Sequence, residues 1–105
     1  MRRSAKVDSN QPEIVKALRS IGAFVLVTSQ LKNAFDVLVG YRGKLFIIEI
    51  KDGSRPLSQR KLTDGELKCK EGFESVGIPY HVVNSIDEAI ELITTTNENN
   101  LTFLC

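Results

Sequence analysis

The sequence lacks a long apolar run. No run approaches the roughly 18–20 residues that a membrane-spanning helix needs. The polar start, Met1 to Ser4, also lacks the apolar core of a signal peptide. We therefore expect a cytoplasmic protein without a membrane partner. The 105 residues suit a single domain, 1–105, with a modest core.

Cysteine is also scarce, and the charges nearly cancel. Cys69 and Cys105 have no CxxC spacing and no nearby His partner, so they indicate neither a disulfide framework nor a zinc site. We interpret both as free thiols. The formal net charge is +1, so the overall field gives no strong reason to expect a polyanionic partner. Local patterns of charged residues carry more information.

The order of helical and strand patterns predicts an α/β fold. Apolar residues with helical spacing follow the helix-opening run Asp8 to Glu13 and stop at Gly22. The near-continuous apolar stretch 23–28 predicts a strand covered on both faces. The other expected elements are a hairpin over 34–51, a helix over about 64–75, a strand over 80–83 and a helix containing 86–93. The order αβββαβα gives a mixed sheet of about four strands flanked by helices, with flexible ends at 1–7 and 95–105.

Asp36 and Glu49 lie on the two apolar strands of the predicted hairpin, which are joined by the tight link 41–44. If 42–43 is a two-residue loop, the register of the hairpin pairs Asp36 with Glu49. Opposed residues on antiparallel strands hold their Cβ atoms roughly 4.5–5.5 Å apart, and like charges there are destabilising. Two carboxylates are therefore predicted to meet across the hairpin.

A divalent cation would offset the repulsion between these carboxylates. Mg²⁺ and Mn²⁺ prefer carboxylate, carbonyl and water oxygens. Alternation along the strand places Lys51 on the same face as Glu49, with Ile48 and Ile50 on the other face. The alternative is an exposed Glu49–Lys51 ion pair worth about 0–1 kcal/mol. The apolar neighbours of positions 36 and 49 argue against full exposure, so we favour a metal and a lysine in one small site.

This arrangement resembles the PD-(D/E)XK nuclease superfamily. An acidic residue on a first helix, an Asp at a strand and Glu-x-Lys on the next strand follow the superfamily order. The stretches 6–15, 36–43 and 48–53 are similar to the small stand-alone VRR-NUC nucleases of phages. One departure is Phe35, which stands where the superfamily has Pro before the Asp. That Pro offers a metal no lone pair, so we do not take its absence as a loss of activity.

The resemblance implies a restriction-endonuclease-like core and metal-dependent hydrolysis of DNA. The Asp36 and Glu49 carboxylates and the Ile50 backbone carbonyl would bind Mg²⁺ or Mn²⁺, and Lys51 would position or polarise the attacking water. Glu13 matches the acidic residue on the first helix and would bind a second ion or orient metal-bound water. Its alternative reading is an ordinary helix-start Glu that complements the helix dipole. The number of ions, one or two, stays open.

Other polar residues are weaker candidates. Basic side chains around the hairpin and the following loop could contact a phosphate backbone or simply be solvated, namely Arg42, Lys44, Arg55, Arg60 and Lys61. Glu66 lies in a segment that resembles the family's region near the site. His81 is interpreted as a core or edge histidine, and Tyr41 and Tyr80 are expected to pack in the core rather than to stack on bases.

Three functions remain in competition. The first is an endonuclease selective for branched, junction or flap DNA, like Holliday-junction resolvases. Such substrates suit a homodimer, and a phage enzyme would work in the host cytoplasm. The second is a catalytically inactive nucleic-acid-binding module with the same fold. The third is an unrelated α/β interaction protein with an incidental acidic pair, and it alone predicts no salt-sensitive DNA binding.

Overall fold

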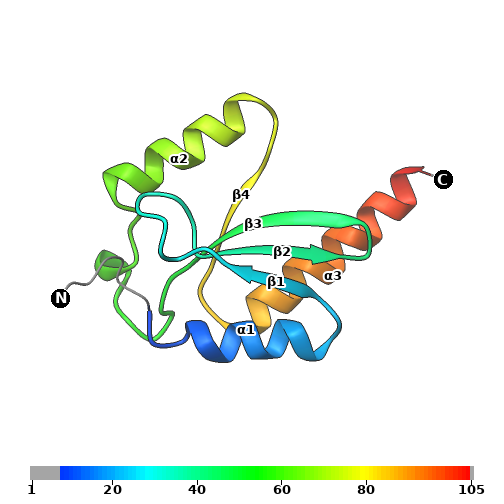
Figure 1. The fold of residues 1–105 in the computed structure, drawn as a ribbon, viewed down its shortest axis with the longest axis horizontal. Coiled ribbons are helices and arrows are strands. Elements are labelled where there is room, and N and C mark those ends of the chain that lie inside the picture. The colour runs from blue at the N-terminus through cyan, green and yellow to red at the C-terminus, as the bar shows by residue number, and fades with distance from the viewer. Residues whose placement is uncertain (1–7, 105) are drawn as a thin grey trace.

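The computed structural model describes the backbone of residues 8–104 and the side chains of residues 8–95 (Figure 1). A single sheet is flanked by helices, and the predicted order αβββαβα is confirmed, with one added 3₁₀ turn. The elements are α1 (Gln11–Ser20), β1 (Phe24–Val27), β2 (Val37–Tyr41), β3 (Lys44–Ile50), the 3₁₀ turn η1 (Leu57–Gln59), α2 (Asp64–Ser75), β4 (Tyr80–Val83) and α3 (Ile86–Leu104).

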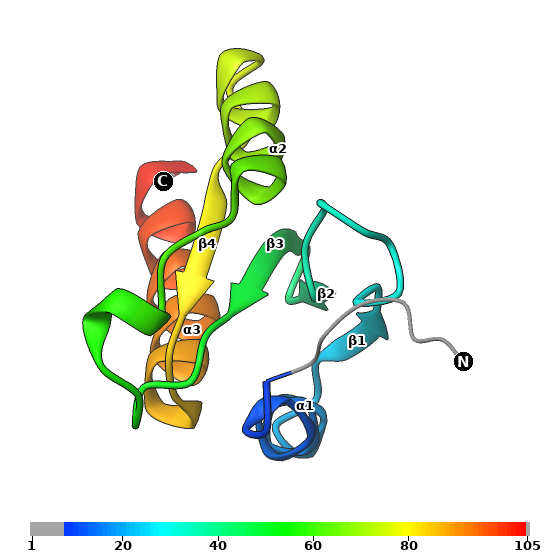
Figure 2. The same ribbon diagram turned by 90° about the vertical axis from the view of Figure 1, so that its left-hand side faces the viewer.

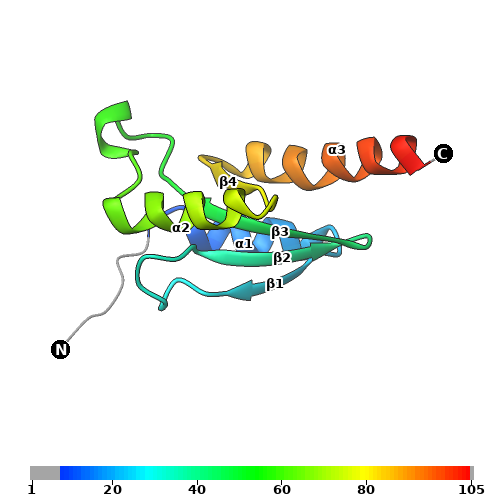
Figure 3. The ribbon, with the colours of Figure 1, turned by 90° about the horizontal axis from the view of Figure 1, so that it is seen from above.

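The sheet is mixed, as the sequence predicts. Its strand order is β1-β2-β3-β4; the first three strands are antiparallel and β4 lies parallel to β3. The parallel pair requires a crossover, and the segment that contains α2 provides it. Helices α1 and α3 lie on one side of the sheet, whereas α2 lies on the opposite side near β4 (Figure 1, Figure 2 and Figure 3).

The hydrophobic core lies between the sheet and the α1–α3 layer. Alternation along β2 and β3 sends every second side chain to this layer, and the helical spacing of α1 brings Ile14 and Leu18 to meet them. The largest fully buried side chains come from both layers and are Ile14, Leu18, Val37, Val39, Ile48, Ile50 and Ile93. The strands that carry the candidate acids are therefore held by the best-packed part of the molecule.

Strand β1 differs from the prediction. The apolar run predicts a strand covered on both faces, but Phe24 is 72% exposed and Leu26 is 50% exposed. The reason is that β1 is an edge strand, and α1 packs only against the face that carries Val25. The Arg19 guanidinium donates a hydrogen bond to the Val25 carbonyl (2.9 Å), which occupies part of the free edge.

The β2–β3 hairpin has the predicted register. Both residues of its two-residue loop have positive φ, 49° at Arg42 and 82° at Gly43, as the tight turn of a twisted hairpin requires. The ladder pairs Val37 with Ile48 at its far end. This turn fixes which side chains face each other over the whole length of the two strands.

The helix boundaries are close to those expected, except at the C-terminal end. Helix α3 continues to Leu104, past Thr94, where the sequence becomes polar and the helix was expected to end. The predicted flexible ends fall largely outside the described residues, because residues 1–7 and 105 and the side chains of 96–104 are not described. Within the part of the chain that is described, no helix has both the length and the apolar character to cross a bilayer.

Candidate active site

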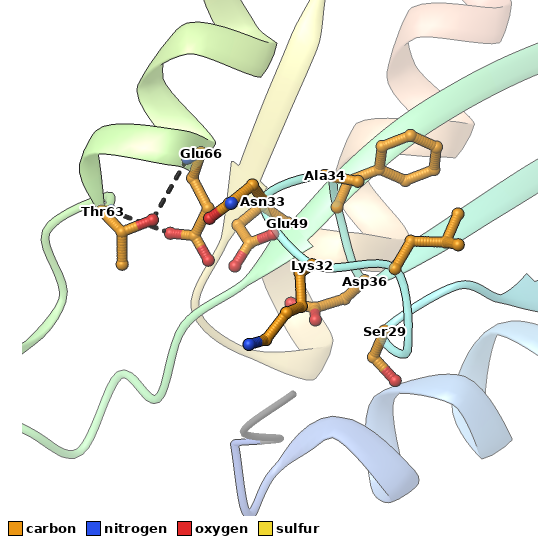
Figure 4. Close-up of a pocket in the computed structure, with 10 residues that line it drawn as sticks. Ser29, Lys32, Asn33, Ala34, Asp36, Glu49, Thr63 and Glu66 are labelled. Carbon is orange, nitrogen blue, oxygen red and sulfur yellow. Dashed lines mark hydrogen bonds between the residues drawn. The ribbon is translucent and has the colours of Figure 1, made fainter. Parts of the chain in front are cut away.

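A hollow lies at the end of the hairpin opposite its turn, where Asp36 and Glu49 face each other. Asp36 immediately precedes β2 and Glu49 is the second-last residue of β3, so the register that pairs Val37 with Ile48 brings the two acids opposite one another. Their residues are only 8% and 4% exposed. Figure 4 shows both carboxylates at the hollow, beside the loop that carries Lys32 and the start of α2.

Asp36 is fixed by the backbone of β3. Its Oδ2 atom accepts a hydrogen bond from the Ile50 amide (2.8 Å), and its own amide donates to the Ile48 carbonyl (3.1 Å). The carboxylate thus takes the place of a backbone acceptor where the β2–β3 ladder ends. One oxygen of Asp36 is held in place, which sets the position of the second oxygen toward the hollow.

The electrostatics of the pair are those of two acids buried together. Burial raises the pKa of Glu49 to about 9, and the negative charges of Asp36 and Glu66 add to this rise. Burial also raises the pKa of Asp36, although the hydrogen bond from the Ile50 amide opposes the rise. The pair therefore favours either a bound proton or a bound cation.

Lys51 brings a positive charge to this pair. Its Nζ lies 3.5 Å from Glu49 Oε2 and 3.0 Å from Glu66 Oε1. Burial lowers the pKa of Lys51, but the hydrogen bond to Glu66 and the charges of Glu66 and Glu49 outweigh it, so the net pKa is raised. The Asn10 side chain donates to the Lys51 carbonyl (3.1 Å) and fixes the backbone at this point. Lys51 is therefore an ammonium group at neutral pH.

Glu66 contributes a third carboxylate, from the first turn of α2. Thr63 and Glu66 form a capping box: the Thr63 hydroxyl accepts from the Glu66 amide (3.1 Å) and the Glu66 carboxylate accepts from the Thr63 amide (3.0 Å). Burial raises the pKa of Glu66, but its bonds to the Thr63 amide and to Lys51 outweigh this and lower the pKa. The Thr-x-x-Glu spacing indicates the cap in the sequence, whereas no sequence signal indicates the contact with Lys51.

A search of solved structures matches the chain to a VRR_NUC domain, with a TM-score of 0.59 and 24% sequence identity. The match covers 82% of this chain and 96% of that chain. The chain has the VRR-NUC domain fold. No family model matches the sequence, and no curated protein matches it significantly. The likeness confirms the predicted restriction-endonuclease-like architecture.

The structure does not bring Glu13 to the carboxylate pair. Glu13 is exposed and lines a different hollow, with Asn10 and Asp52. Asp8, before α1, instead lines the hollow with Asp36, and burial raises the pKa of Asp8. The sequence predicts Glu13 for this role because its position matches the acidic residue that the family carries on its first helix. The chain that leads into α1, rather than α1 itself, carries the acid that reaches the site.

The predicted basic residues divide into two groups. Arg55 and Lys61 line the hollow with the acidic pair. Arg60 lines the hollow of Glu13, and Arg42 and Lys44 lie at the hairpin turn, at the far end of β2 and β3 (Figure 1). A basic residue not singled out from the sequence, Lys32, lies beside the pair on the 29–35 loop (Figure 4).

Tyr80 packs in the core beside Glu49, and His81 packs against Phe46. Tyr80 is buried, and its hydroxyl donates to the Ala34 carbonyl (2.8 Å) and lies 3.4 Å from Glu49 Oε1. The His81 ring is half-buried against Phe46 at 6.0 Å between centroids, and burial lowers the pKa of His81. Cys69 is a free thiol, as expected, whereas Cys105 lies outside the described residues.

The donors of this VRR-NUC fold fit a hydrated divalent cation. Two buried, mutually repelling carboxylates provide oxygen ligands, and the hollow leaves space for water. Over residues 8–95, no three His, Cys, Asp or Glu side chains converge closely enough to hold a metal ion. Such an ion would therefore take two carboxylates, with waters and the predicted Ile50 carbonyl completing its shell. Mg²⁺, which keeps several waters, suits such a set.

Proposed function

We propose that this protein is a divalent-metal-dependent endonuclease that hydrolyses DNA phosphodiester bonds. The observation that carries the proposal is the pair of buried acids, Asp36 and Glu49, opposed across one hairpin with the Lys51 ammonium 3.5 Å from the second acid. An incidental surface pair would be solvated and would not need two strands of the core to hold it. The VRR-NUC fold supports a nuclease.

Each residue has a distinct role in the proposed reaction. Asp36 and Glu49 would hold Mg²⁺ or Mn²⁺, which when bound polarises a phosphate oxygen and acidifies a water ligand. Lys51 has a raised pKa and is charged at neutral pH, so it would neutralise the negative charge that grows on the phosphate rather than accept a proton. Asp36 and Glu49 are buried and the Lys51 side chain is largely covered, which strengthens these interactions because little water screens them.

DNA is the proposed substrate because basic residues surround the acidic pair. Lys32 lines the hollow on one side of the acidic pair, and Arg55 and Lys61 line an adjoining hollow that shares the pair, so the three could contact phosphates on either side of the cleaved bond. A domain of this size offers few side chains to read bases, so we propose selectivity for DNA shape, such as a branch, junction or flap. Cutting both strands at a branch needs two sites, and the homodimer stays a prediction that sedimentation of free and junction-bound protein would test.

The test compares wild type with Asp36→Asn and Lys51→Ala on linear, flap and four-way-junction DNA, in Mg²⁺, in Mn²⁺ and in EDTA. We expect metal-dependent cutting by wild type only. The control is Glu74→Gln, because Glu74 forms an exposed ion pair with Lys70 on the same helix as Glu66 (2.7 Å) and should leave cutting unchanged. Cutting that persists in both site variants would show that the reaction occurs elsewhere.

The alternative is an inactive module that binds nucleic acid. It predicts salt-sensitive binding by wild type without cutting in any metal. No binding and no cutting would favour the third possibility, an interaction protein with an incidental acidic pair. The same titrations therefore separate all three functions.

A further inference from the structure

We propose that Glu66 is a positioning residue that holds the Lys51 ammonium away from the metal ligand Glu49 and aimed at the phosphate. The proposal rests on the endonuclease function proposed above. Glu66 lines the hollow with the acidic pair, and its carboxylate is bonded to Lys51, so the proposal gives α2 a direct part in the chemistry. Glu66 acts through Lys51, so its effect must disappear when Lys51 is absent.

The Glu66 carboxylate is held in place by its own helix. The same oxygen, Oε1, accepts one hydrogen bond from Lys51 Nζ and one from the Thr63 amide, each 3.0 Å long. The Thr63 hydroxyl accepts from the Glu66 amide and closes the capping box. A carboxylate with a fixed rotamer can hold a bonded ammonium group in one position. The four-carbon stem of a lysine is flexible, so its ammonium needs such a partner to stay in place.

The start of α2 is itself fixed against the loop that leads into Asp36. Gly65 packs directly on the Asn33 side chain, so closely that a Cβ at position 65 would overlap it. Asn33 lies on the 29–35 loop, and Figure 4 shows this loop and the start of α2 forming two walls of the hollow. The anchor for Lys51 therefore has a defined position relative to Asp36 as well as relative to Glu49.

Without Glu66, the nearest partner for the Lys51 ammonium is Glu49. The two groups are already 3.5 Å apart, a loose pair compared with the 3.0 Å bond to Glu66. Loss of Glu66 would let the ammonium close on Glu49 and compete with a cation for the same oxygens. Two effects follow: the ammonium leaves its place beside the phosphate, and more metal is needed to fill the site.

The experiment measures single-turnover cutting of a DNA substrate across a range of Mg²⁺ concentrations for Glu66→Ala, Glu66→Gln and Thr63→Ala. At saturating Mg²⁺ we expect Glu66→Ala to slow cutting about 100-fold, the cost of a misplaced group, with little change in DNA affinity. Its half-maximal Mg²⁺ concentration should rise. Glu66→Gln keeps a carbonyl that can accept both bonds and should recover most of the rate. Thr63→Ala weakens the cap but keeps the anchor, so its rate should change far less.

The decisive comparison repeats Glu66→Ala in a Lys51→Ala background. No further loss of rate is expected there, because the residue that Glu66 positions is gone. An equal loss in both backgrounds, or equal losses for Glu66→Ala and Thr63→Ala, would mean that Glu66 only caps the helix and would overturn the proposal.

A second measurement does not depend on cutting. Acylation of Lys51 by an amine-reactive reagent is followed by mass spectrometry of metal-free protein. It should speed up several-fold in Glu66→Ala and not in the control Glu74→Ala, because the Lys51 amine then has one carboxylate partner in place of two, even when it closes on Glu49. An unchanged rate would overturn the positioning role. Failure of wild type to cut any DNA in either metal would instead overturn the proposed function, and the labelling would still decide whether Glu66 holds Lys51.

Discussion

Glu49→Gln should remove a pH dependence of stability that comes from the buried acidic pair. In the unfolded chain Glu49 has an ordinary pKa of 4.5, whereas in the folded, metal-free protein the pKa is about 9. Between these values the folded protein keeps a proton that the unfolded chain has released. The free energy of unfolding must therefore fall as the pH rises through this range, and Gln, which does not titrate, should abolish the fall.

The effect of Glu49 is best measured in the pH window between about pH 7 and about pH 8.5, because the other buried groups titrate mainly outside this window. His81 has a pKa lowered from 6.5 by burial, so it acts at lower pH, where its effect has the opposite sign. Cys69 has a pKa raised from 9.0 by burial, so its contribution is lost above the window. One proton corresponds to at most about 1.4 kcal/mol per pH unit, or about 2 kcal/mol across the window.

The assay is urea unfolding followed by circular dichroism, in EDTA, at several pH values within the window. Wild type should lose up to about 2 kcal/mol, whereas Glu49→Gln should change little. Added Mg²⁺ should stabilise wild type most at the upper end of the window, where the pair is closest to ionised, and should stabilise the variant less. If the free energy of unfolding falls equally with pH for the two proteins in EDTA, the folded acidic pair does not retain a proton in this range and the reasoning is refuted.

Three further outcomes follow from the structure. Gly65→Ala should destabilise the protein by about 1–3 kcal/mol in urea unfolding because its Cβ would overlap the side chain of Asn33, and adding Asn33→Gly should restore much of the loss. Arg55→Ala should weaken DNA binding and reduce its salt slope by about 1 in anisotropy titrations, while Arg42→Ala, at the distant turn, should change neither. Ser85→Ala should cost about 1 kcal/mol in thermal unfolding, because its hydroxyl caps α3.

The hairpin and its acidic pair could be predicted from the sequence because short-range rules determine them. A two-residue loop between apolar strands sets one register, and that register decides which side chain opposes Asp36. Burial of Asp36 and Glu49 likewise follows from apolar neighbours on both strands. No contact between distant segments is needed to reach these conclusions.

The remaining features depend on how distant segments pack. Glu13 and Asp8 are both acidic residues near the start of α1, and only the path of the chain into the helix decides that Asp8 lines the hollow. Glu66 meets Lys51 because the connection between β3 and β4 brings the first turn of α2 back to the end of β3, which periodicity within α2 does not reveal. The exposure of Phe24 follows from the edge position of β1, and an apolar run looks the same at an edge as at the centre.

Helix α2 has no fully buried residue, although it supplies the anchor for Lys51. Segments with little buried apolar surface open locally at low free-energy cost, so amide hydrogens of α2 should exchange with solvent well before those of β2 and β3. The acids opposed across the hairpin do not depend on α2 for their positions. Local opening of α2 would therefore release the Lys51 ammonium from its anchor while the two acids keep their positions, and closing of the helix would restore the contact.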